Sequence, residues 1–204
     1  MAGSFNTIYS LIYPVLSGIL YNLPMGDFSV LYVTICNQIR SEILSFEKLL
    51  SSSQDYERLL QTYSNIKSTV EIVDDHTSFL IFGNIVHNSL AMYIFMHTLL
   101  NEEAANYYKF YEIIFFFLIT FSTFIAVTVS ASMVTEASLM VASKSRSLPI
   151  RTLDSQFVLQ RLLLCLEKEI YFTVWKIVPI RRNFIVGTMG AVLTYVVLFH
   201  SLDI

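Results

Sequence analysis

The chain has 204 residues, of which 54% are hydrophobic and only 14% are charged, and its formal net charge is −3. Soluble domains carry about a quarter charged residues, so this composition favours an integral membrane protein. The small negative charge excludes the basic surface that nucleic-acid binding requires, and we expect no nucleic-acid partner.

Four apolar segments are long enough to cross a bilayer core, which needs about 20 helical residues. They are residues 5–21, 79–100, 113–135 and 183–202, and none of them contains Asp, Glu, Lys or Arg. The whole chain, 1–204, is therefore predicted to form one all-α, polytopic membrane domain with about four transmembrane helices. Without charged groups at mid-membrane depth, an ion or proton pump is disfavoured.

The cationic residues predict the orientation of these spans. Every Lys and Arg except Lys109 lies in one of two stretches, Arg40–Lys67 and Lys144–Arg182. Lys and Arg close to span ends tend to stay in the cytoplasm, so both stretches are expected inside and the C-terminus outside. The N-terminus is then also outside. We expect an odd number of further spans upstream, with a genuine four-span protein as the alternative.

Two segments between the spans have helical periodicity. In the cytoplasmic segment 28–75, apolar residues recur every three or four positions on both sides of a polar break at Ser51–Ser53. A further amphipathic helix is expected in the cytoplasmic segment 143–182. These helices either pack together as a cytoplasmic base or lie on the membrane surface, and their mixed charges favour the base.

The sequence has no motif of a known catalytic or nucleotide site, and its histidines lack metal-ligand spacing. We therefore expect neither an enzyme nor a cofactor or metal. Asn84 and Asn88 in the second span either form interhelical hydrogen bonds or line a polar cavity.

Aromatic side chains gather near the expected outer ends of the first three spans. Tyr13, Tyr93, His97 and Phe115 are candidates for a pocket that binds a small organic molecule. An aromatic belt at the membrane interface explains the same residues equally well.

The last span has a distinctive face. Thr194, Val197 and Ser201 lie on one side at helical spacing, and Gly187 and Gly190 permit close helix approach. Repeated around a symmetry axis, such a face would line a narrow pore. The alternative is an ordinary packed span.

The end of the chain resembles the arthropod gustatory receptor family. The signature of that family is Thr-Tyr, five hydrophobic residues and then Gln-Phe. Thr194 and Tyr195 match it, and 196–199 fit the apolar run, whereas His200, Ser201 and Leu202 depart from it. The order of spans and polar segments is also similar over the whole chain.

The resemblance implies the last four helices of a seven-helix receptor in the plasma membrane. Such receptors are ligand-gated cation channels, homo- or hetero-tetramers in which the last helix lines the pore and the cytoplasmic helices form an anchor. The ligand would be a small-molecule tastant or odorant, and the bilayer the other partner. Three alternatives stay open: a pore-less scaffold or assembly subunit, a membrane transporter or enzyme, and a G-protein-coupled receptor, which an outside C-terminus disfavours.

Overall fold

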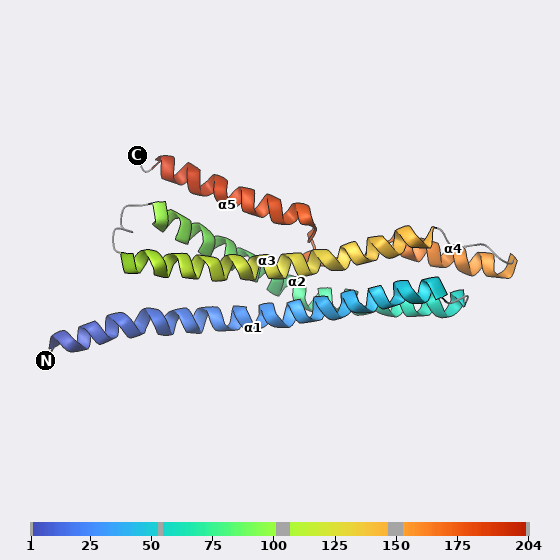
Figure 1. Ribbon diagram of the computed structural model, residues 1–204, viewed down its shortest axis with the longest axis horizontal. Helices are drawn as coiled ribbons and strands as arrows, with labels where there is room; N and C mark the ends of the chain where they lie inside the picture. The colour runs from blue at the N-terminus through green and yellow to red at the C-terminus, as the bar shows by residue number, and fades with distance from the viewer. Residues whose placement is uncertain (1, 53–54, 101–106, 147–152, 203–204) are drawn as a thin grey trace.

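The computed structural model describes residues 2–52, 55–100, 107–146 and 153–202, with side chains for 23–52, 55–100, 110–146 and 157–201. Five helices and one small hairpin make up these residues. The helices are α1 Ala2–Ser52, α2 Tyr56–Leu100, α3 Tyr107–Ser145, α4 Leu153–Glu167 and α5 Arg182–Leu202. The predicted all-α class is confirmed, and the N-terminal end of α1 lies at the same end of the molecule as the C-terminal end of α5 (Figure 1).

The polar break at Ser51–Ser53 was predicted correctly, because α1 ends at Ser52 and α2 begins at Tyr56. Asp55 forms the N-cap of α2: its side chain accepts the amide of Arg58 at 3.1 Å, and its carbonyl accepts the amide of Leu59 at 3.1 Å. The helices are longer than the expected segments. The segments 5–21 and 28–50 form one continuous rod in α1, and α2 continues without interruption from the second apolar stripe, which follows the polar break, into the expected span 79–100.

The amphipathic stripes of α1, α2 and α4 pack against one another and against α3, as the base alternative requires. Tyr32, Phe46 and Tyr63 are fully buried there, and the rings of Phe46 and Tyr63 lie 5.4 Å apart. Small residues on α3, among them Ala131 and Ser138, let the neighbouring helices approach closely. Together α4, the C-terminal part of α1, the N-terminal part of α2 and the C-terminal end of α3 form what we call the helical base.

Three helices in the described part of the chain are long and apolar enough to cross a membrane. They are Tyr56–Leu100, Phe110–Ser145 and Arg182–Ser201, and they contain three of the four expected spans. The remaining expected span, 5–21, is helical within α1, but its side chains lie outside the described residues. The chain is thus a multi-pass membrane protein, and the individual span limits stay predictions.

A short antiparallel hairpin precedes α5, and the sequence did not predict it. Its strands, β1 Thr173–Val174 and β2 Val178–Pro179, pair Thr173 with Pro179 and Val174 with Val178. The tip residues Trp175 and Lys176 have φ values of 51° and 56°, in the left-handed region that non-glycine residues rarely adopt. The hairpin connects α4 in the base to α5.

Candidate functional site

The last helix, α5, has two unlike faces. Val192 and Val196 are buried and, with the partly buried Ile185 and Met189, form the stripe through which α5 joins the hydrophobic core. On the opposite side the surface is open. A Cβ built on Gly187 or on Gly190 would meet no described atom within 4 Å, so these glycines do not serve close packing against the part of the chain that the structure describes.

The three predicted pore residues lie on this open face. Thr194 and Ser201 are exposed, and Val197 is 66% exposed. The two hydroxyl groups donate to their own helix: Thr194 Oγ1 to the carbonyl of Gly190 at 2.8 Å and Ser201 Oγ to the carbonyl of Leu198 at 2.7 Å. Their donors are therefore satisfied, and each hydroxyl oxygen keeps acceptor capacity toward the open side.

A cavity of about 330 Å³ lies between α2 and α5 and is lined only by apolar surface. Its lining residues come from both helices and are Ser89, Leu90, Tyr93, Val192, Tyr195 and Phe199. The rings of Tyr93 and Phe199 meet edge to face at 6.0 Å, and Tyr195 stacks on Phe199 at 6.4 Å. Apolar, aromatic walls of this kind suit a small, largely apolar organic molecule.

The structure brings together only part of the predicted ligand set. Tyr93 lines the cavity, and the ring of His97 lies 5.9 Å from that of Tyr93. Phe115 lies instead on α3, where it is 60% exposed and its ring contacts Phe116 at 5.8 Å. The side chain of Tyr13 lies outside the described residues.

Sequence reasoning missed the contribution of α5 to this cavity. In the sequence, Tyr195 belongs to the Thr-Tyr motif and Phe199 to the apolar run that follows it. Their spacing of four residues places both on one helical face. That signal pairs them with each other, but it does not reveal that α2 lies opposite.

The two asparagines in the membrane part of α2 serve helix packing. Asn84 is fully buried and donates to Ser29 Oγ of α1 at 3.0 Å, and Asn88 donates to the Asn84 side chain at 2.8 Å. Such bonds are favourable in lipid, where buried polar groups have no water to bond. Asn84 therefore fits the interhelical alternative, whereas Asn88 bonds within α2, to the side chain and the carbonyl of Asn84.

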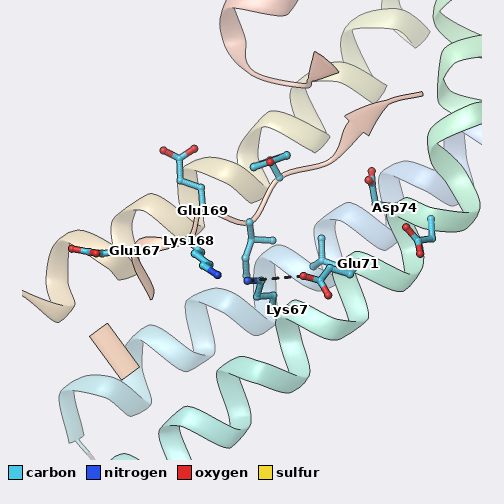
Figure 2. Close-up of a pocket in the computed structure, with 10 residues that line it drawn as sticks. Lys67, Glu71, Asp74, Glu167, Lys168 and Glu169 are labelled. Carbon is cyan, nitrogen blue, oxygen red and sulfur yellow. Dashed lines mark ion pairs between the residues drawn. The ribbon is translucent and has the colours of Figure 1, made fainter. Parts of the chain in front are cut away.

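A second cavity, of about 530 Å³, lies at the base between α2 and the segment that follows α4. Acidic groups dominate its lining, which includes Asp75. Figure 2 labels the other charged residues there: Glu71, Asp74, Glu167 and Glu169, beside Lys67 and Lys168. Lys67 and Glu71 form an ion pair at 4.0 Å. Among the described residues no group of three or more His, Cys, Asp or Glu is arranged to hold a metal ion.

Asp74, in the wall of this cavity, is hydrogen-bonded to the hairpin. Its two carboxylate oxygens accept the backbone amide and the hydroxyl of Thr173, each at 2.7 Å. The neighbouring Asp75 pairs with Lys176 at 2.6 Å, which raises the pKa of that ammonium group. Two ion pairs, Arg181 with Glu169 and Arg182 with Glu136, then join the start of α5 to the base.

The fold is shared with insect chemosensory receptors. The structure of the olfactory receptor OR5 from Machilis hrabei matches with a TM-score of 0.71 and 18% identity, over 95% of this chain and 52% of that chain. The structure of the same receptor with eugenol matches with a TM-score of 0.76 and 16% identity, over 97% and 53%. This chain thus spans about half the length of those receptor chains.

No family model matches the sequence, and no curated protein matches it either. The likeness to the solved receptors is therefore one of structure. It confirms, at the level of the fold, the resemblance that Thr194 and Tyr195 suggested. The chain has the fold of the insect olfactory receptor OR5 over about half of that receptor's length.

Proposed function

We propose that this chain belongs to a chemosensory receptor, gustatory by its Thr194–Tyr195 motif, that acts as a ligand-gated cation channel. The open face of α5 carries the proposal: Thr194, Val197 and Ser201 have no covering element within the described chain. Four copies around an axis, as homo- or hetero-tetramer, would turn four such faces toward one another and enclose a pore.

The ligand is a small, largely apolar organic molecule, a tastant or odorant. One of the solved receptors of this fold was determined in complex with eugenol. In this chain the cavity between α2 and α5 offers Tyr93, Tyr195 and Phe199 to such a molecule. Because Tyr195 and Phe199 share α5 with the proposed pore residues, a ligand there would have different affinities for two positions of α5, and that difference drives gating.

The receptor sits in the plasma membrane with its C-terminus outside and its helical base in the cytoplasm. The base acts as the anchor through which subunits meet. The cationic stretches Arg40–Lys67 and Lys144–Arg182 support this orientation. The packing of the base helices against one another supports the anchor.

The direct test expresses the full-length gene in oocytes and records current while a panel of small aromatic compounds is applied. The proposal predicts a cation current that appears only with particular compounds. No evoked current from protein shown to be at the cell surface would favour the pore-less scaffold instead. An epitope tag after Ile204 should be accessible on intact cells, and a tag found only after permeabilisation would favour a G-protein-coupled receptor.

A further inference from the structure

The hairpin tip between α4 and α5 exposes large apolar side chains to its surroundings. Trp175 is 51% exposed, and Ile177 is 73% exposed. Trp175 also extends an aromatic group on α2, since its ring lies 4.8 Å from that of Phe82 and 6.2 Å from that of Phe79. Phe79 itself is 63% exposed, so the tip and the start of the apolar part of α2 form one continuous surface.

This tip is held rigidly in place. The Trp175 amide donates to the carbonyl of Ser78 on α2 at 3.1 Å, and the Ile177 amide closes the turn on the carbonyl of Val174 at 3.0 Å. Asp74 and Asp75 bind Thr173 and Lys176 on either side of it. Both tip residues adopt positive φ, a strained backbone that persists only where surrounding contacts impose it.

Two separate parts of the chain indicate the depth of the hairpin tip relative to the bilayer. On α2, charged residues end with Asp75, and the apolar run begins at Phe79. On α5, charged residues end with Arg182, and the apolar run begins at Phe184. The contacts of Asp74, Asp75 and Ser78 with the hairpin therefore hold Trp175 and Ile177 at the boundary between water and the hydrocarbon core.

We infer that the Trp175–Ile177 tip docks into the headgroup boundary of the cytoplasmic leaflet and sets the depth of α5 in the membrane. Trp combines a flat apolar ring with one N–H donor, a combination that favours the membrane–water interface. Ile177 lies in the acyl region just below, and Lys176 keeps its ammonium group in the water, on Asp75. This inference needs only that α2 and α5 span the bilayer, so it stands or fails independently of ion conduction.

Trp175 is the single tryptophan of the chain, so its fluorescence reports this position alone. The purified chain is placed in phosphatidylcholine vesicles whose lipids carry bromine either near the headgroup or at the acyl-chain ends. We expect roughly twofold stronger quenching by the shallow bromines, and weak quenching by iodide on both sides of the vesicle. Quenching by iodide without quenching by bromine would overturn the inference, because the tip would then face water.

Shielding from both quenchers would also overturn it, since the tip would then be covered by protein, such as a second copy. A pair of variants checks the role of Ile177. Ile177→Asp should raise iodide quenching roughly twofold by lifting the tip from the apolar region. Leu49→Asp puts the same acid on an exposed apolar site of the base and should change nothing. If Ile177→Asp loses helical circular dichroism, Ile177→Ser replaces it. Unchanged quenching in a folded Ile177 variant would contradict the inference.

Discussion

The helical base and the membrane half of this molecule are packed very differently. In the base, large side chains such as Tyr32, Phe46 and Leu162 are completely buried by other parts of the same chain. In the membrane half, the buried share of the most apolar stretch falls to 28% in α2, 22% in α3 and 11% in α5. The helices also diverge toward that end, as Figure 1 shows for α5 and α1.

The contrast shows which part of the described chain buries its apolar surface within itself and which part leaves it exposed. The base hides its apolar surface within the chain and gains the corresponding stability in water. In the membrane half, lipid covers apolar surface at no cost, so exposure there is permitted. The exposed glycine and hydroxyl residues on α5 gain little from lipid contact, and the proposed tetramer would bring them against other copies of α5.

The largest expected effect is the loss of a buried ring in the base. Phe46→Ala should lower the free energy of unfolding by about 3–5 kcal/mol, because it removes apolar contacts and leaves a cavity. Denaturant unfolding of the chain in detergent micelles measures this. Phe115→Ala, at an exposed site of the membrane half, should cost less than about 1 kcal/mol. Equal costs would contradict the difference between the two regions.

The next effect concerns the joint between the regions. Asp74→Asn replaces a charged acceptor of two hydrogen bonds from Thr173 and should cost about 1.5–3 kcal/mol of unfolding free energy. Asp75→Asn is the matched control. Its ion pair with Lys176 is exposed to solvent, so this variant should lose clearly less stability than Asp74→Asn. A larger loss of unfolding free energy for Asp75→Asn than for Asp74→Asn would argue against Asp74 as the main contact that holds the hairpin on α2.

A positive charge on the open face of α5 should block cations. Val197→Lys is expected to reduce ligand-evoked cation current roughly tenfold, because a barrier increase of about 1.4 kcal/mol is enough for that change. Leu49→Lys adds the same charge to the exposed surface of the base and should leave conductance unaltered. Patch recordings with unchanged conductance and selectivity for Val197→Lys would reject this face as pore lining.

A smaller effect is expected at the cavity between α2 and α5. Tyr195→Ala should raise the ligand concentration for half-maximal current about 2–10-fold, since one aromatic contact is worth about 0.5–1.5 kcal/mol. Phe115→Ala distinguishes the pocket seen in the structure from the one predicted from the sequence. Phe115 lies on α3 and does not line this cavity, so its loss should have little effect on ligand sensitivity. A stronger effect of Phe115→Ala would place the ligand beside α3 instead.

The smallest effect tests how tightly the base is closed. Burial raises the pKa of the Cys36 thiol from 9.0 to about 12. The folded protein therefore holds this proton more firmly than the unfolded chain. The resulting stability is complete below pH 9.0 and is lost as the pH rises toward about 12.

At neutral pH a maleimide should react with the partly exposed Cys165 well before it reacts with Cys36. Rapid labelling of Cys36 would show that the base opens.

The periodicity of apolar residues in the sequence was sufficient to predict the helices of the base. Apolar residues every three or four positions, with the break at Ser51–Ser53, predicted both stripes and the boundary between α1 and α2. The hairpin could not be predicted in this way, because its strands have two residues each and its tip uses Trp175 and Lys176 where Gly or Asn would mark a turn.

The site was predicted in part for a related reason. Helical spacing places Thr194, Val197 and Ser201 on one face, and the structure leaves that face open. Spacing along a helix does not identify the opposing helix. The pairing of Tyr93 with Phe199 across α2 and α5 depends on tertiary packing, and so does the separation of Phe115 from both.

A cysteine scan along α5 during ligand-evoked current tests the central claim most directly. A charged thiol reagent applied from outside should alter the current through channels with cysteine at Gly190, Thr194, Val197 or Ser201. It should have no effect at the buried Val192 and Val196, which produces a helical pattern of reactivity. Uniform reactivity along α5, or reactivity at Val192 and Val196 instead, would contradict an open face that lines a pore.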